Sequence, residues 1–284
     1  MHVSPGAPAT VPPPAPDSAV STALRAANRA GVRIRLAEDI RTLEAVSRFF
    51  ARVWQTPETQ APFGADVLRG VVHAGGAVHY AADDEGILAA SALIFCPPAT
   101  RAVYSLIAAA RASDRGVGFA LKQAQRVWAL DRGAETMVWT FDPLVSRNAH
   151  FNLAKLGAHG TEYTVDFYGQ IEDGLNGTDE TDRLTAVWPL REPNPARLTG
   201  PDLAAAEVDP RRAPDGEPFL ARDSSGYWCR VPADIVDVRR LDARLSAQWR
   251  YAIRDALVPL FAEGCTATGF SRSGWYRLTE GELA

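Results

Sequence analysis

The stretch that decides the fold is Leu106-Ile-Ala-Ala-Ala-Arg-Ala-Ser-Asp-Arg-Gly-Val-Gly-Phe-Ala-Leu121. Its first residues complete an apolar run over 102–110, which has the length and composition of a buried strand. Two glycines follow the run, and Val117, Leu121 and Trp128 then recur at helical spacing. The segment therefore predicts a strand, a glycine loop and a helix, with Gly133 ending the helix.

Strand patterns flank this segment on both sides. Two apolar runs, 77–82 and 87–95, are separated by the turn-forming Asp-Asp-Glu-Gly, which predicts an antiparallel hairpin. Downstream, 136–141 is rich in β-forming residues and precedes a short helix over about 146–156. A hairpin followed by a helical crossover indicates a mixed α/β sheet that is mostly antiparallel and flanked by helices.

Composition divides the chain into four parts. Residues 1–30 are rich in Pro and Ala, so we expect a disordered tail, and 31–190 carry the strand and helix patterns of one domain. Six prolines mark 191–218 as a connection. Residues 219–284 contain one long amphipathic helix and short strands, which bury too little surface to fold alone. We expect them to form a C-terminal α/β extension packed on the core.

Composition also excludes several classes of protein. The 284 residues are 46% hydrophobic, but no apolar run approaches the roughly 18 residues of a membrane span. The start of the chain lacks the basic and apolar regions of a signal peptide, so we expect a cytoplasmic protein without a membrane partner. Three well-separated cysteines argue against a disulfide framework or a metal site. A net charge of -4 gives no basic footprint for nucleic acid.

The glycine loop has the features of a phosphate cradle. Backbone N–H groups at a helix N-terminus lack intrahelical partners and attract anions. Gly116 and Gly118 would let a ligand approach the backbone, and Arg115 could add a charge-assisted hydrogen bond. The dinucleotide fingerprint requires a small residue where Leu121 stands, and the spacing before Lys122 does not fit a P-loop. A tight structural turn is the remaining alternative.

Two stretches together resemble a known family. The run around 112–121 resembles the pyrophosphate loop of the GNAT family of N-acetyltransferases. The run Trp139-Thr-Phe-Asp-Pro-Leu-Val-Ser-Arg-Asn-Ala-His-Phe-Asn-Leu-Ala-Lys-Leu-Gly157 resembles a bacterial branch of predicted acetyltransferases in that family. The likeness extends from about residue 33 to residue 279. It implies a GNAT-type sheet and an acyl-coenzyme A donor, acetyl-CoA or another acyl-CoA, with no metal.

The resemblance also implies where the donor binds. The strand before the loop would hydrogen-bond the pantetheine arm through its backbone, and the strand ending at Phe141 would splay away from it. The donor-binding residues are then Leu106, Ile107, Ala108, Ala109, Ala110, Arg111, Arg115, Gly116, Val117, Gly118, Phe119, Ala120, Asn148, Phe151 and Asn152.

The resemblance implies direct transfer of the acyl group, acetyl or succinyl, to the amine of an amino acid or other small molecule. Asp142 could orient or deprotonate that amine, or it could cap the next helix; Arg147 could hold a substrate carboxylate or be solvated. Tyr163 and Tyr168 could supply a hydroxyl acid or pack on the sheet. The chain could also form a homodimer.

Two positions depart from the family pattern. Ser113 replaces the usual Gln or Arg of the loop, and Leu153 replaces the usual tyrosine that protonates the leaving thiolate. These departures keep a second reading open, a catalytically silent GNAT-like module that binds acyl-CoA for regulation. A protein-lysine acetyltransferase is a third reading, but no recognition domain is evident.

Overall fold

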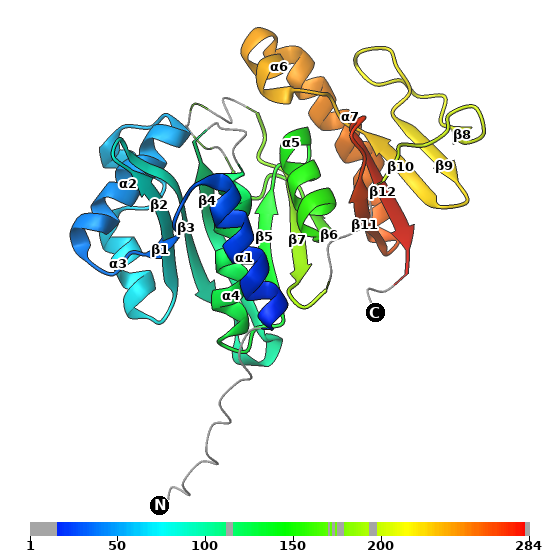
Figure 1. Cartoon of the computed structure of the whole chain (residues 1–284). Helices are drawn as coiled ribbons and strands as arrows, with labels where there is room; N and C mark the ends of the chain where they lie inside the picture. The colour runs from blue at the N-terminus through cyan, green and yellow to red at the C-terminus, as the bar shows by residue number, and fades with distance from the viewer. Residues whose placement is uncertain are drawn as a thin grey trace, which may run out of the picture.

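One twelve-stranded sheet runs through the computed structural model, which describes residues 16–111, 116–169, 171, 174, 179–192 and 198–281 (Figure 1). The strands lie in the order β1-β2-β3-β4-β5-β7-β6-β11-β12-β10-β9-β8. Their bounds are β1 Arg35–Leu36, β2 Ala77–Asp83, β3 Gly86–Phe95, β4 Ala102–Ala110, β5 Thr136–Phe141, β6 His159–Thr164, β7 Arg183–Pro189, β8 Glu207–Val208, β9 Leu220–Asp223, β10 Gly226–Arg230, β11 Cys265–Phe270 and β12 Trp275–Glu280.

Helices cover both faces of the sheet. The α-helices are α1 Asp17–Ala30, α2 Ile40–Trp54, α3 Ala65–His73, α4 Val117–Leu130, α5 Ser146–Ala149, α6 Ile235–Leu241 and α7 Ala243–Ala262. Two short 3-10 helices, η1 Glu58–Gln60 and η2 Pro98–Thr100, and the π-helix η3 His150–Leu156 complete the set in the described residues. Among the strand pairs described, only β4 and β5 run parallel. The predicted mixed, mostly antiparallel sheet flanked by helices is therefore confirmed.

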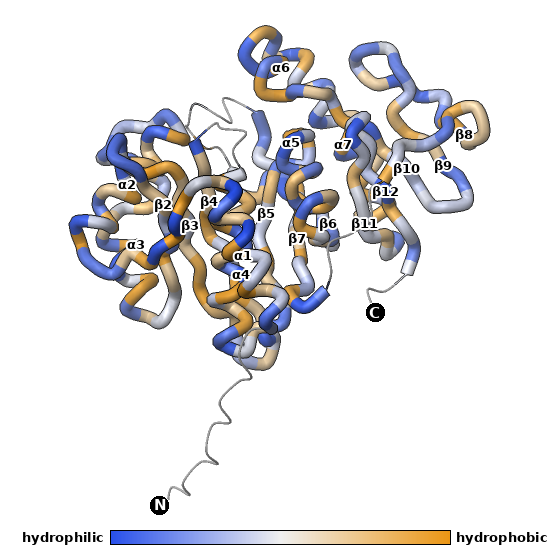
Figure 2. Tube along the Cα trace, viewed as in Figure 1, coloured by the Kyte–Doolittle hydropathy of each residue, from blue (hydrophilic) through white to orange (hydrophobic). Residues whose placement is uncertain are grey.

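The two faces have separate cores. Side chains of α1 and α4, including Ala26 and Leu121, pack with Ala89 of β3 on one face. Side chains of α2 and α3, including Phe50 and Leu68, pack on the opposite face. Figure 1 shows α1 lying alongside α4, and Figure 2 shows apolar residues concentrated along the central strands.

Helix α1 overturns the expectation of a disordered tail up to residue 30. The prolines of this region end at Pro16, and the helix begins directly after it. Ala19, Ala26 and Ala30 are buried at helical spacing. Alanine has the highest helix propensity but contributes little to a hydrophobic pattern, so the helix is hard to recognise. The prediction is wrong for residues 17–30, and residues 1–15 lie outside the described part.

The C-terminal extension continues the sheet of the core. Gly160 of β6 pairs with Ala267 of β11, and β12, β10, β9 and β8 follow in order. A Cβ at Gly160 would stand 2.9 Å from the Leu184 side chain and 3.0 Å from the Cβ of Ala267, so a side chain there would have to displace its neighbours. The proline-rich connection contributes the edge strand β8, which pairs with β9.

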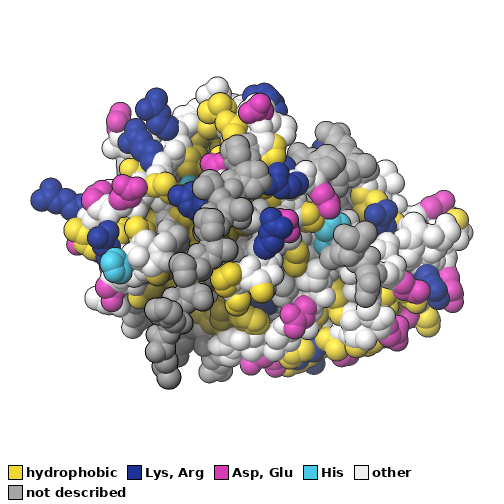
Figure 3. All heavy atoms as spheres, turned by 90° about the horizontal axis from the view of Figure 1, so that it is seen from below, with side chains coloured by type: hydrophobic (Ala, Val, Ile, Leu, Met, Phe, Trp, Pro, Cys, Tyr) yellow, Lys and Arg dark blue, Asp and Glu magenta, His cyan; other side chains and the backbone are white. Residues whose placement is uncertain are grey.

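The described surface carries charges of both signs. Figure 3 shows Lys and Arg side chains interspersed with Asp and Glu over the face that it presents. None of the helices in the described ranges is long and apolar enough to cross a membrane.

Candidate functional site

The parallel strands β4 and β5 separate part-way along their length. They pair at Ala102 with Thr136 and at Val103 with Met137, and the last pair is Tyr104 with Val138. Beyond Tyr104, β4 continues to pair with β3 on its other side as far as Ala110. Toward β5, the backbone of 105–110 has no strand partner among the described residues. The two strands therefore form a fork with unpaired N–H and C=O groups along one arm.

A β-bulge lies where the fork opens. Ala92 of β3 pairs with Ile107, whereas the next residue, Leu93, pairs with Ser105, so Leu106 is an extra residue in β4. A bulge bends its strand and increases the local twist. The irregularity thus turns β4 away from β5 at the last shared pair, which is the splay that the family resemblance implies.

The N-terminus of α4 lies beside the end of β4. Gly116 caps the helix with a φ of 80°, a left-handed conformation that favours glycine. A Cβ at Gly118 would stand 3.7 Å from the Cβ of Ala110, so the first turn of the helix and the open arm of the fork are neighbours. The first-turn amides of α4, at residues 117–119, have no intrahelical acceptor. Ser113 and Arg115 lie outside the described residues.

The remaining predicted donor residues are distributed around this fork. Arg111 is exposed after β4, with its guanidinium 3.7 Å from the Glu85 carboxylate. Arg147 and Asn148 are exposed on α5, which begins five residues after β5. Phe151 is half-buried on η3, whereas Asn152 is almost fully buried. The predicted helix over 146–156 is thus α5 continued by a π-helix, a form common at functional sites.

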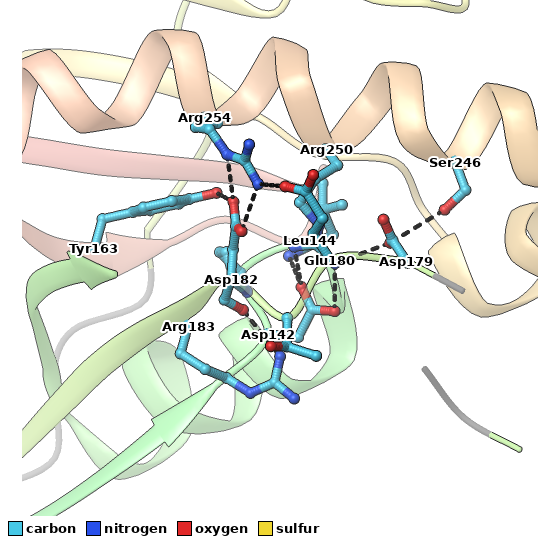
Figure 4. Close-up of polar contacts among 12 residues, drawn as sticks. Asp142, Leu144, Tyr163, Asp179, Glu180, Asp182, Arg183, Ser246, Arg250 and Arg254 are labelled. Carbon is cyan, nitrogen blue, oxygen red and sulfur yellow. Dashed lines mark hydrogen bonds and ion pairs between the residues drawn. The ribbon is translucent and has the colours of Figure 1, made fainter. Parts of the chain in front are cut away.

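Asp142 is held in a buried ion pair at the end of β5 (Figure 4). Its two carboxylate oxygens accept from Arg250 at 2.9 Å each, and Arg239 also donates to it. Its Oδ1 accepts from the backbone N–H of Leu144, so it also caps the turn. Burial opposes ionisation, but the guanidinium groups outweigh it, so the pKa of Asp142 lies well below its usual range. These contacts favour the capping role and leave no basic carboxylate for amine deprotonation.

Tyr163 belongs to the same charged cluster. Its hydroxyl donates to Asp182 at 2.6 Å, and Arg254 binds the same carboxylate. Burial and the Asp182 charge raise the pKa of Tyr163 above its usual range. The Asp179 carboxylate forms ion pairs with Arg239 and Arg250, and the Glu180 carboxylate forms one with Arg254. The cluster thus joins α6 and α7 to the core, and Tyr163 is a structural member of it.

Tyr168 is the predicted catalytic residue that remains accessible. The residue is 49% exposed, and its hydroxyl lies 3.4 Å from the hydroxyl of Thr140 on β5. The Arg183 guanidinium lies 5.1 Å from the ring centroid. Tyr104, at the last shared pair of the fork, also hydrogen-bonds Thr140; burial raises its pKa and this bond opposes the rise. Three hydroxyls therefore gather beside the fork.

Sequence reasoning missed Tyr104, Thr140 and one buried lysine. Lys122 projects from α4 into the interface with the sheet and is 5% exposed. Its Nζ lies 3.1 Å from Ser105 Oγ and 3.9 Å from the centre of the Trp139 ring. A lysine directly after Leu121, within an apolar helical pattern, is the signal that could have revealed it. No group of three or more potential metal-ligating side chains is found within the described ranges.

Comparison with known proteins gives partial matches. No protein-family model matches the sequence, and no curated protein matches it. An N-acetyltransferase from Staphylococcus aureus Mu50 is 17% identical with a TM-score of 0.46, over 56% of this chain and 99% of that one. The ribosomal-protein-S18-alanine N-acetyltransferase from Escherichia coli is 11% identical, with a TM-score of 0.45 over 59% and 99%. The Salmonella typhimurium protein yncA, solved with its cofactor acetyl-CoA, is 15% identical, with a TM-score of 0.44 over 57% and 95%.

Proposed function

We propose that this chain is an acyl-CoA-dependent N-acyltransferase of the GNAT type, which transfers an acetyl or succinyl group to an amino acid or another small amine. The observation that carries the proposal is the β4–β5 fork, with the amides of α4 at the end of its open arm. The sequence resemblance around 112–121 and 139–157 supports the same reading.

The residues present fit an acyl-CoA thioester. The unpaired backbone of 105–110 offers alternating donors and acceptors to the amides of the pantetheine arm. The first-turn amides of α4 suit a pyrophosphate, because the helix N-terminus carries a partial positive charge. Gly118 leaves the space between that turn and Ala110 free of a side chain. The thioester supplies the activated acyl group.

The protein's part in the chemistry is positioning and charge stabilisation. Bringing amine and thioester together supplies much of the rate, and a backbone N–H of the open arm would stabilise the oxyanion. Tyr168 would relay the proton of the amine by accepting it as its own hydroxyl proton passes to solvent, because this hydroxyl is accessible and lies 3.4 Å from that of Thr140. Arg147 is exposed close to the end of β5, where it would bind a substrate carboxylate. Asp142 and Tyr163 would serve in the charged cluster that joins α6 and α7 to the core.

A specific observation favours a second candidate, a silent acyl-CoA-binding regulatory module. Two of the three predicted catalytic side chains, Asp142 and Tyr163, are engaged in the buried cluster. Leu153, where the family's tyrosine is expected, is 1% exposed in the core. Such a module would bind the donor without turnover.

The experiment is a product screen by mass spectrometry. The full chain is incubated with acetyl-CoA or succinyl-CoA and a panel of amino acids and small amines, and free CoA is measured in parallel. An acylated amine, formed faster by the wild type than by Tyr168→Phe, supports the enzyme. Saturable donor binding without product from any amine would instead favour the regulatory module.

A further inference from the structure

Lys122 occupies the point where the two strands part. Tyr104 and Val138 form the last pair, so Ser105 on β4 and Trp139 on β5 are the first residues of the two arms. The Nζ of Lys122 contacts both, at 3.1 Å from Ser105 Oγ and 3.9 Å from the Trp139 ring centre. The ammonium group of α4 thus lies against the base of the fork.

The surroundings of this ammonium are nearly apolar. From α4, Gln125 faces the same Ser105 hydroxyl, and from β5 the Met137 sulfur lies 3.9 Å from Nζ. No carboxylate in the described residues pairs with it. Desolvation by burial lowers the pKa of Lys122 to about 7, and no charged side chain of the described part contributes to the shift. A buried cation without a counter-ion is costly, so its presence at this position calls for a reason.

We infer that Lys122 is the proton donor to the thiolate that leaves when the acyl group is transferred, a catalytic role which rests on the proposed function. The open arm of β4 begins at Ser105, so a thioester held along that arm places its sulfur near the base of the fork. Leu153 cannot provide a proton from the neighbouring helix, whereas the ammonium of Lys122 can.

The proton balance is complete. As the amine nitrogen bonds to the acyl carbon, the carbon–sulfur bond breaks and its electron pair stays on sulfur. Lys122 gives one proton from Nζ to that sulfur and becomes a neutral amine. The proton lost by the attacking nitrogen leaves through Tyr168 to solvent, and Lys122 is reprotonated from solvent before the next cycle. A thiol has a pKa of about 8.5, so transfer from this ammonium is downhill.

The experiment compares CoA with desulfo-CoA, which lacks the sulfur, and needs no acceptor. Calorimetric titrations are made with the wild type and with Lys122→Met. Lys155→Met is the matched control, because Lys155 is the only other lysine of the chain and is exposed. The ultraviolet thiolate band of bound CoA is followed against pH in the same proteins.

We expect the wild type to bind CoA about tenfold more tightly than desulfo-CoA, the value of one charge-assisted hydrogen bond. Lys122→Met should abolish that preference and leave desulfo-CoA affinity unchanged. The bound thiol should ionise at a lower pH in the wild type and in Lys155→Met than in Lys122→Met.

Equal affinities of the wild type for the two ligands, with no shift of the thiolate band, overturn the assignment. An equal loss of both affinities in Lys122→Met would mean that the lysine only supports the fold, and it also overturns the assignment. Absence of CoA binding by a folded wild type would refute the donor site itself, so the two failures are distinguishable.

Discussion

Arg250 of α7 donates two hydrogen bonds of 2.9 Å to Asp142, the residue after β5, across 108 positions of the chain. The arginine side chain is 1% exposed and the aspartate side chain 8% exposed. Asp142 directly follows the strand that forms one arm of the fork. The C-terminal extension is therefore fastened beside the candidate site, and the arm's position depends on a helix that begins about a hundred residues later.

The first prediction concerns this pair. Replacing Arg250 by Met leaves Asp142 buried with only Arg239, and breaking a buried ion pair typically costs about 3 to 5 kcal/mol. We expect a loss of that size in the free energy of unfolding, measured by urea denaturation. The control is Arg101→Met, which breaks the exposed Arg101–Glu135 pair and should cost less than about 1 kcal/mol. Equal costs for the two variants would contradict the proposed role of the cluster.

The second prediction is an acid dependence of stability. The pKa of Asp142 is lower in the folded chain than the unfolded value of about 3.9, because Arg250 and Arg239 outweigh the effect of burial. Its stabilisation is complete above the unfolded pKa and is lost as the pH falls through the folded one. We expect the stability difference between wild type and Asp142→Asn to be large at neutral pH and smaller below pH 4. A difference that did not change with pH would count against this assignment.

The third prediction concerns the stability cost of Lys122. Burial places its folded pKa near 7, below the unfolded value of about 10.4. Between about pH 7 and pH 10.4 the unfolded chain binds more protons at Lys122 than the folded chain does. The free energy of unfolding of the wild type therefore rises with pH over this range. Lys122→Met should stabilise the protein most below pH 7, by an upper limit of about 5 kcal/mol at roughly 1.4 kcal/mol per pKa unit. Thermal melts at pH 6 and pH 9 measure this; a larger gain at pH 9 would refute the buried-cation account.

The fourth prediction is that residues 220–280 do not fold alone. The segment lacks β6, the neighbour of β11, and its arginines at 239, 250 and 254 lack the carboxylates that they bind in the whole chain. We expect no cooperative thermal transition by circular dichroism, in contrast to the full chain. A cooperative transition of the isolated segment would show that it is an independent domain.

Much of the core could be predicted from the sequence, because its elements have clear periodicity. The hairpin of β2 and β3, the strand β4, and the helix that starts after Gly116 agree with the predictions. Helix α1 was missed because its buried face consists of alanines. The continuation of the core sheet by β11 could not be predicted, since strand pairing over 107 residues leaves no local pattern.

The candidate site was predicted less completely. The fork and the neighbouring α4 lie where the resemblance places the donor site, yet Asp142 proved to be the partner of distant arginines and Tyr163 the partner of Asp182. The arginines that bind Asp142 lie on α6 and α7, and the spacing of Arg250 and Arg254 shows a shared helix face but not what it binds. Lys122 was not recognised as a buried group, because the long stem of a single lysine in an apolar helix usually lets its ammonium group reach solvent.

The most direct test of the central claim is isothermal titration of acetyl-CoA and CoA into wild type and Gly118→Val. A valine at 118 would place a β-branched side chain on the first turn of α4, where it would block the close approach of a phosphate to the helix amides, while the nearest contact of its Cβ, 3.7 Å from Ala110, is compatible with folding. Leu153→Ala, a packing change in the core, serves as the control. We predict saturable binding by the wild type, none by a folded Gly118→Val, and near-normal affinity in the control. Unchanged acetyl-CoA affinity in a folded Gly118→Val protein would contradict the assignment of the donor site to the β4–α4 junction.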